Sequence, residues 1–364
     1  MRVAFDARMV YYRRAGIGQY SIQLLRALAD LPPNEAGDVR VTVLQSRKDP
    51  VPLVQDPRFR RRPLITPCHH RYEQAGLAVE LATVRADVLH SPDFIPPFHR
   101  ACPAVITVHD LAFLRFPNLL TGESARYYGQ IRRAVQSAEA IIAVSASTAH
   151  DLVALAGADP QKIHTIYEAA APIFQPGPPP VLPGYLLFVS TIEPRKNLRT
   201  LLAAYRLLLD GGRVRPVPPL WVVGQRGWLY EDSLQAISDL HLGDTVRLLG
   251  GVDAAALPAL YQGARLFALP SLYEGFGLGA LEALACGTPV LAADAGALPE
   301  VVGDAGLLLP PSDPAAWATA LERVLGDPAL EADLRRRGPV QAARFSWAQA
   351  ARQTLAVYRQ LAAL

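Results

Sequence analysis

The sequence contains few cysteines and no long apolar run. Its three cysteines, Cys68, Cys102 and Cys286, are odd in number and far apart, which argues against the disulfide framework of a small secreted protein. No apolar stretch approaches the ~18 residues that a membrane-spanning helix needs. The amino-terminal stretch MRVAFDARMV lacks the apolar segment of a signal peptide and is typical of a first strand. These absences predict a cytoplasmic protein.

An excess of charge of one sign is also missing. The 36 basic and 33 acidic side chains leave a net charge of +3, so we expect no nucleic-acid partner. The basic run RFRRRP (58–63) is a candidate for peripheral contact with anionic lipid at the inner face of a membrane. The alternative, which we favour, is a solvated loop. The sequence PCHH (67–70) lacks a second ligand pair at useful spacing, so we expect a surface loop there and no metal site.

Length and composition indicate a globular protein of two domains. The chain has 364 residues, of which 51% are hydrophobic and 19% charged, and it is too long for one ordinary core. Short β-branched runs alternate with helical patterns, as in βα units that build a parallel sheet. In the first half we expect strands at 2–8, 39–45, 86–92, 104–110 and 140–145, and helices at 18–31 and 129–138.

A proline-rich segment, APIFQPGPPPVLPG (171–184), interrupts this alternation and is the predicted linker, because it cannot continue a helix or a central strand. The chain therefore predicts an α/β fold of two Rossmann-like αβα domains, 1–170 and 185–345, facing across a cleft. A terminal helix, 346–364, is expected to cross back to the first domain. In the second half we expect strands at 185–191, 220–225, 245–251, 264–271, 289–294 and 306–311, and further helices at 197–210 and 278–286.

Two candidate site loops follow strands of the first domain. Gly16 and Gly18 open a helix, where free backbone N–H groups and the helix dipole favour an anion; an ordinary turn is the alternative. His109 ends the strand AVITVH, so it is placed to hydrogen-bond a substrate hydroxyl or to carry a proton near neutral pH. Asp110 is a rival for this role, and a structural histidine is the alternative.

A third candidate loop, STIEPRKNL (190–198), follows the first strand of the second domain. Arg195 and Lys196 lie there just before a helix. Two cations beside a helix N-terminus suit a diphosphate and can stabilise a departing phosphate without a metal. The alternative is a solvated loop of charges, which we favour less because Pro194 stiffens the turn that aims the two side chains.

The fourth candidate loop lies in SLYEGFGLGALEALACGTPV (271–290). Glu274 follows a strand, and the glycines after it allow backbone N–H groups to approach a ligand closely. Glu282 lies about one turn into an apolar helix, where a carboxylate without a partner would be costly. Hydroxyl groups of a ligand would satisfy it, and a salt bridge to a nearby arginine is the alternative.

This stretch resembles the E-x7-E signature of retaining glycosyltransferases of family 4, which have the GT-B fold. The similarity covers most of the chain and is very specific for the family, but much less specific for the sugar. Its other motifs are GIGQY, VHD, TIEPRKN, LLGGV, LPSLYEGFG and LPEVVGDAGLLLPPSD.

The resemblance implies a role for each motif. Arg195 and Lys196 would bind the diphosphate of a nucleotide-sugar donor, and Glu282 would hold its ribose hydroxyls. Glu274 would hold the donor sugar, and His109 would lie near the sugar and the acceptor; with Arg195 and Lys196 they form the implied catalytic set. The other implied donor-binding residues are Gly16, Gly18, Thr191, Gly251, Val252, Gly275, Phe276, Gly277 and Leu278.

The implied reaction is transfer of a sugar to an acceptor hydroxyl with retention, by a metal-independent enzyme without cofactors. The form with TIEPRKN and GIGQY is similar to a subgroup rich in polysaccharide mannosyltransferases, which favours GDP-mannose; a UDP-sugar (glucose, galactose or GlcNAc) is the alternative. Ser190 and Thr191 stand where many members have Gly-Arg, so Arg195 is expected to substitute for that arginine. Gly279 stands where proline is frequent.

Two other functions are compatible with such a fold. A sugar-nucleotide 2-epimerase would need additional acids and bases, and a non-catalytic nucleotide-sugar-binding protein would show binding without turnover. The expected acceptor is a glycan or a lipid-linked sugar, and the sequence does not identify it.

Overall fold

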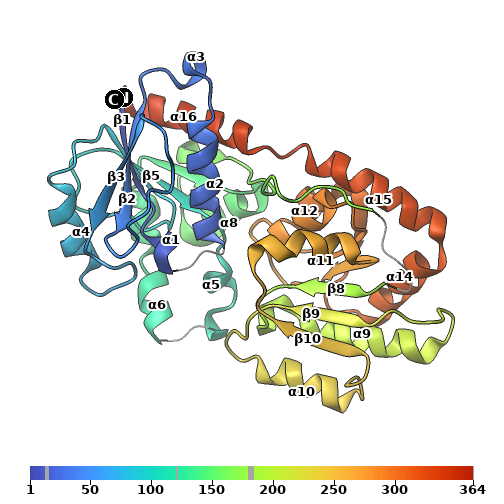
Figure 1. The fold of residues 1–364 in the computed structure, drawn as a ribbon. Coiled ribbons are helices and arrows are strands. Elements are labelled where there is room, and N and C mark those ends of the chain that lie inside the picture. The colour runs from blue at the N-terminus through green and yellow to red at the C-terminus, as the bar shows by residue number, and fades with distance from the viewer. Residues whose placement is uncertain (13–15, 120–121, 179–183, 364) are drawn as a thin grey trace. The chain divides into compact units, whose positions relative to one another are not determined.

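The chain folds into two α/β units. The structure is a computed structural model that describes residues 1–12, 16–119, 122–178 and 184–363. Its N-terminal unit comprises Met1–Glu168 and Ser346–Leu364, and its C-terminal unit comprises Ala169–Phe345. Each unit is built on one parallel sheet (Figure 1). The α/β class predicted from the alternation of strands and helices is confirmed.

The N-terminal unit contains a seven-stranded sheet of order β3-β2-β1-β4-β5-β6-β7. All five strands expected in this half are present, and β3 and β7 are additional. The strands are β1 (Arg2–Asp6), β2 (Arg40–Ser46), β3 (Phe59–Leu64), β4 (Val88–Ser91), β5 (Ala104–Val108), β6 (Ala140–Ala143) and β7 (Ile163–Thr165).

Residues 59–63 of the basic run lie in strand β3, so the solvated loop that we favoured is wrong. β3 pairs in parallel with β2 from Phe59 to Leu64, and both of these end residues are buried. An edge strand accepts this sequence because only one of its flanks is paired. Exposed arginines and a proline, here Pro63, are common at such edges.

Helices cover both faces of this sheet. Val3 and Phe5 of β1 point into a core shared with α2 and α16, whereas Ala4 between them packs with Leu77 of α4 on the other face. Figure 1 shows α16 crossing α2, which it contacts. The helices are α1 (Met9–Tyr12), α2 (Ile17–Ala29), α3 (Pro33–Ala36), α4 (Glu73–Leu81), α5 (Ala112–Arg115), α6 (Gly122–Tyr128), α7 (Ile131–Ser137), α8 (Ala146–Ala156) and α16 (Trp347–Ala362), with 3-10 turns η1 (Pro117–Leu119) and η2 (Pro160–Lys162).

The C-terminal unit contains a six-stranded sheet of order β10-β9-β8-β11-β12-β13. Every strand of this sheet was expected from the sequence. They are β8 (Leu186–Val189), β9 (Leu220–Val223), β10 (Val246–Gly250), β11 (Leu266–Leu269), β12 (Val290–Ala293) and β13 (Gly306–Leu309). The helices are α9 (Leu198–Gly211), α10 (Glu231–Asp239), α11 (Leu257–Gly263), α12 (Leu278–Ala285), α13 (Leu298–Val302), α14 (Pro314–Gly326) and α15 (Pro328–Ala342), with 3-10 turns η3 (Pro194–Lys196), η4 (Ala254–Ala256) and η5 (Gly303–Ala305).

The strand order reverses between β8 and β11. From β8 the chain adds β9 and β10 on one side, and β11, β12 and β13 follow on the other. In such sheets ligands bind outside the carboxyl ends of the strands at this switch point. The loops after β8 and β11 carry two of the four candidate motifs, so the topology brings those motifs together.

The proline-rich segment begins with a turn, in which the N–H of Phe174 donates to the carbonyl of Ala171, and packs within the C-terminal unit. Phe174 contacts the ring of Tyr261, and the amide of Gln262 donates to the carbonyl of Gln175. Residues 179–183 of the predicted linker lie outside the described residues. No helix in the described part of the chain is both long and apolar enough to cross a membrane.

Candidate functional site

The loops after β8 and β11 meet through a charged cluster. Lys196, in the turn η3, donates from its ammonium group to both carboxylate oxygens of Glu274, at 2.7 and 2.8 Å. The hydroxyl of Ser271 donates to the same carboxylate at 2.7 Å. The side chains of Glu274 and Lys196 are each only 12% exposed. The structure thus brings together two predicted site residues that lie 78 positions apart.

The cations around Glu274 keep it ionised. Burial by itself would raise the pKa of this carboxyl, but the ammonium of Lys196 and the guanidinium of Arg195 outweigh burial and hold the pKa below its usual range. Lys196 was expected to bind the diphosphate and Glu274 the sugar. In the structure the two side chains bind each other, so a donor that uses both must form its contacts around an existing ion pair.

Arg195 ties the same two loops together. Its guanidinium donates to the backbone oxygen of Tyr273 at 2.9 Å and to the carboxylate of Glu193 at 3.0 Å, and lies 3.7 Å from Glu274. The backbone oxygen of Arg195 also accepts from the N–H of Leu272. Many family members have an arginine at the position of Thr191, and the substitution of Arg195 for that arginine stays a prediction. The position of Arg195 beside Glu274 is compatible with this prediction.

Glu282 lies in α12 and has no basic partner in the part of the chain that the structure describes. Its carboxylate accepts one hydrogen bond from the hydroxyl of Tyr261, at 3.1 Å. No ion pair of Glu282 occurs among the described residues, so the salt-bridge alternative is wrong there. Burial raises the pKa of Glu282 to about 7, and the single hydrogen bond from Tyr261 only partly opposes this shift. The carboxylate of Glu282 can accept further hydrogen bonds, so two hydroxyl groups of a ligand could donate to it.

The remaining predicted donor-binding positions of the C-terminal unit are distributed along the same edge of the sheet. Gly275 and Phe276 are buried in the loop after β11, Gly277 precedes α12 with a φ of 102°, and Leu278 begins that helix. Thr191 is exposed in the loop after β8. Gly251 and Val252 follow β10, the strand that lies at the sheet edge two positions from β8.

Two supporting residues of the C-terminal unit were missed by sequence reasoning. Gly296 has a φ of 57°, and a Cβ there would collide with the backbone of Glu274, whose carbonyl also accepts from Ala297. The side-chain amide of Asn197 donates to the carbonyls of Pro270 and Pro311, at 3.0 and 2.7 Å. For Gly296, its position after strand β12 was a weak signal in the sequence. For Asn197, the sequence gave no signal beyond its place in the motif TIEPRKN.

The two predicted glycines of the N-terminal unit lie at the start of α2. Gly16 is the residue before the helix, with a φ of 52°, and Gly18 is buried in its first turn. The helix begins at Ile17, one residue before the expected start at 18. Residues 13–15 of this loop lie outside the described residues.

His109 follows β5 and has both ring nitrogens occupied. Nδ1 lies 2.8 Å from the carboxylate of Glu168, and Nε2 lies 3.1 Å from the backbone oxygen of Pro92. Burial opposes protonation, but the hydrogen bond and charge of Glu168 outweigh it and raise the pKa of His109. Glu168 carried no recognisable sequence signal, because it lies 59 residues from His109. Asp110, the rival residue, accepts from the backbone N–H of Ala112 at 3.0 Å.

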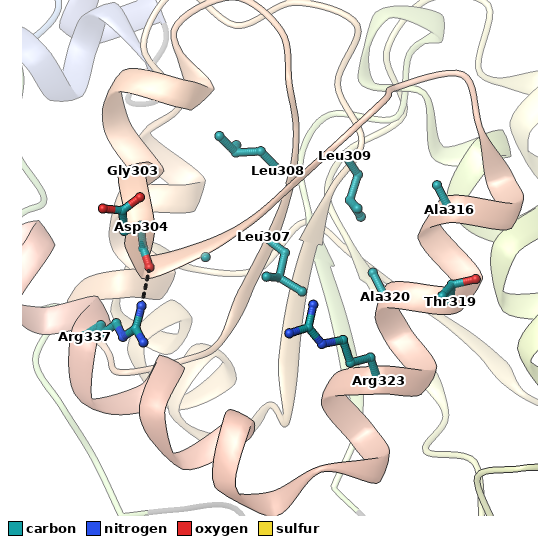
Figure 2. A pocket seen from close by; sticks show the side chains of 11 residues that line it. Gly303, Asp304, Leu307, Leu308, Leu309, Ala316, Thr319, Ala320, Arg323 and Arg337 are labelled. Atoms are coloured by element: carbon teal, nitrogen blue, oxygen red, sulfur yellow. Dashed lines mark hydrogen bonds between the residues drawn. The ribbon is translucent and has the colours of Figure 1, made fainter.

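One open cavity of about 700 Å³ lies at the β13 edge of the C-terminal sheet (Figure 2). Leucines of β13, residues of α14 and two arginines, Arg323 and Arg337, line it. Arg337 donates to the backbone oxygen of Asp304 at 3.2 Å. The cavity contains none of the predicted site residues, so it does not mark the candidate site.

Comparison with known proteins establishes the family. Residues 14–170 match Glycosyltransferase Family 4, and residues 172–341 match Glycosyl transferases group 1. The O-antigen chain mannosyltransferase B of Escherichia coli is 33% identical over 99% of this chain and 100% of its own length. The chain belongs to the group 1, family 4 glycosyltransferases, and it is a glycosyltransferase of glycan biosynthesis.

Solved structures show the same fold. Sucrose-phosphate synthase from Thermosynechococcus elongatus matches with a TM-score of 0.81 at 24% identity, covering 100% of this chain and 99% of that one. HepE from Anabaena, in complex with UDP-glucose, matches with a TM-score of 0.75 at 19% identity and 100% coverage of both chains. The expected GT-B fold is confirmed.

Proposed function

We propose that this glycosyltransferase transfers mannose from GDP-mannose, with retention and without a metal, to a hydroxyl of a glycan or lipid-linked acceptor. The observation that carries the proposal is the cluster of Lys196, Arg195 and Glu274 at the switch point of the C-terminal sheet. The full-length similarity to an O-antigen mannosyltransferase supports mannose. A UDP-sugar is the alternative donor, because a structural neighbour was solved with UDP-glucose.

The cations at this point would stabilise the departing phosphate. Lys196 and Arg195 are held in place by Glu274 and Glu193, so their charges need no rearrangement when the bond to the phosphate breaks. Glu282, with one hydrogen bond in the structure, would accept from both ribose hydroxyls. In this proposal the two cations stabilise the charge of the departing phosphate, and no metal is needed for that stabilisation.

Glu274 is a poor candidate for a covalent nucleophile. Both of its oxygens accept from Lys196 and one also accepts from Ser271, which lowers the availability of its lone pairs. We therefore favour attack of the acceptor on the same face of the sugar from which the phosphate leaves. The acceptor proton would pass to the departing phosphate oxygen.

Calorimetry with GDP, UDP and ADP tests the donor site. We expect GDP to bind with a Kd of about 1 μM, equally with and without magnesium. The affinity should rise as the pH increases through about 7, because ionised Glu282 is the better acceptor for the ribose hydroxyls. Replacing Glu282 with alanine should weaken binding about 10- to 100-fold by removing hydrogen bonds to a charged group.

The control for this experiment is Glu231→Ala, which removes an exposed carboxylate from α10 of the same unit and should leave binding unchanged. Preferential binding of UDP would show that the donor is a UDP-sugar and not GDP-mannose. Dependence on magnesium would contradict metal independence, and no binding of any nucleotide would contradict the proposed site.

We also propose a peripheral contact between β3 and anionic lipid. Arg58 and Arg61 are engaged within the unit, by Asp56 and by the backbone of Asp49. Arg60 and Arg62 are exposed, and Arg62 donates one hydrogen bond to the hydroxyl of Thr83. Ile65, directly after the strand, is 67% exposed. A pair of cations beside an apolar side chain suits the surface of an anionic membrane.

Sedimentation with liposomes tests this contact. We expect binding to vesicles with 30% phosphatidylserine, about 30-fold weaker binding after Arg60→Gln with Arg62→Gln, and none to neutral vesicles, since each cation contributes ~1 kcal/mol. The control is Arg213→Gln with Arg336→Gln, two exposed arginines of the C-terminal unit. Equal loss with both double variants would indicate a general charge effect and contradict a contact at β3.

A further inference from the structure

The ring of His109 faces hydrogen-bond acceptors on both sides. The carboxylate of Glu168 lies 2.8 Å from Nδ1, and the carbonyl of Pro92 lies 3.1 Å from Nε2. A carbonyl oxygen and an ionised carboxylate only accept, so both bonds form together only when each ring nitrogen carries a proton. This geometry selects the imidazolium form of His109.

The surroundings fix the ring as well as its protons. Glu168 is buried, with 3% of its side chain exposed, whereas His109 is 18% exposed. Tyr20 of α2 presents its ring to His109 with the centroids 4.7 Å apart and an interplanar angle of 82°. The hydroxyl of Tyr20 is bonded to Thr107 at 3.0 Å, which holds that aromatic wall in place. The imidazole is thereby confined to one orientation, with a limited part of its surface open.

Most of the charged and titratable groups around His109 favour the protonated form of its ring. Burial lowers its pKa, while Glu168 after β7 and, more weakly, Asp93 after β4 raise it, and the result is a raised pKa. His90 in β4 opposes this, but burial lowers the pKa of His90 to about 3, so it is neutral near neutral pH. Burial raises the pKa of Tyr20, which keeps that hydroxyl neutral too. Glu168 is therefore the group on which the charge of His109 mainly depends.

We propose that Glu168 is a positioning residue that holds His109 as a fixed imidazolium, so that His109 serves sugar transfer as a stationary cation and not as a base. This inference rests on the proposed function and on the position near the donor sugar and the acceptor that the family resemblance implies for His109. An imidazolium cannot accept the acceptor's proton. In the transfer the bond from the anomeric carbon to the phosphate oxygen breaks, and a bond to the acceptor oxygen forms. The released proton then goes to the phosphate oxygen of the departing nucleoside diphosphate.

Nitrogen NMR of the histidine rings tests the charge of His109 without any turnover. The protein has eight histidines, and the signal of His109 is assigned by its loss in His109→Gln. At pH 7.0 we expect both ring nitrogens of His109 to be protonated in the wild type. In Glu168→Gln we expect one protonated and one unprotonated nitrogen at that pH, because burial is then opposed only by Asp93 and by the hydrogen bond to the carbonyl of Pro92. A neutral His109 in the wild type would overturn the inference, whatever the enzyme's activity.

The pH dependence of turnover distinguishes positioning from a merely structural role. Relative to wild type, kcat of Glu168→Gln should be about 10- to 100-fold lower at pH 8, as expected when a charge that stabilises the transition state is lost. It should recover to within about threefold at pH 5.5, where the imidazolium forms again, and KM for the donor should change little. Glu168→Asp, which keeps the charge, should restore part of the activity at pH 8.

The matched control is Glu35→Gln, which removes the carboxylate of an exposed pair with Arg352 in the same unit. Its kcat should equal that of the wild type at both pH values. An equal loss of kcat by Glu168→Gln at pH 5.5 and pH 8 would overturn the positioning role. If the protein transfers no sugar at all, the proposed function fails, while the NMR result still decides whether Glu168 sets the charge of His109.

Discussion

Replacing Glu274 with alanine is expected to lower kcat by about 100- to 1,000-fold, the range found when one preorganised electrostatic group is removed from an active site. The carboxylate holds Lys196 by both oxygens and lies 3.7 Å from the guanidinium of Arg195. Without it, the two cations lose the group that holds them in the position from which, in the proposed function, they stabilise the departing phosphate. Single-turnover kinetics at saturating donor measures this effect on the chemical step, and retention of more than a tenth of wild-type kcat would contradict it.

The same substitution is expected to cost about 3 kcal/mol of the free energy of unfolding, because it leaves the ammonium of Lys196 buried without its partner. Removing both charges, in Glu274→Ala with Lys196→Met, should therefore cost less than the sum of the single changes. Urea unfolding of the four proteins in this cycle measures the coupling. Strictly additive costs would show that the pair contributes nothing beyond its separate side chains.

The strands were predictable where they are buried on both faces. The runs that became β5, β6, β11 and β12 are almost wholly apolar and end in polar residues or proline, and each of these strands is fully buried. β3 was missed because an edge strand need not be apolar. Of its six residues, only Phe59 and Leu64 are apolar and buried, and three of the others are arginines. β7, with three residues, is too short to show any period.

The candidate site was predictable to the extent that its residues follow strands. Arg195, Lys196 and Glu274 were expected at one edge of one sheet, and the order of β8 and β11 brings them into contact. Partners from distant parts of the chain were not predictable. Tyr261 lies 21 residues before Glu282, and Glu168 lies 59 residues after His109, and no periodic pattern links such positions. The catalytic roles of all these residues stay predictions.

Glu282→Gln is expected to raise the stability of the ligand-free protein at pH 8.5 by about 3 kcal/mol, and to leave it nearly unchanged at pH 4.5. Burial raises the pKa of this carboxyl from 4.5 to about 7, so the folded protein binds its proton more tightly than the unfolded chain does. The cost of the ionised carboxylate is therefore absent below the unfolded pKa and grows as the pH rises from 4.5 through 7. A neutral glutamine of the same shape removes that cost, and thermal unfolding at a series of pH values measures the difference.

Tyr261→Phe tests the cause of this pH dependence. It removes the one hydrogen bond donated to Glu282, so the pKa should rise further and the loss of stability above pH 7 should become larger. If the stability of Glu282→Gln changed with pH in the same way as that of the wild type, a raised pKa of Glu282 would be contradicted. If the gain at pH 8.5 is found together with weaker nucleotide binding, Glu282 is kept at a cost to the folded state because the ligand needs it. That combination would distinguish a ribose-binding carboxylate from one that only supports the packing of α12.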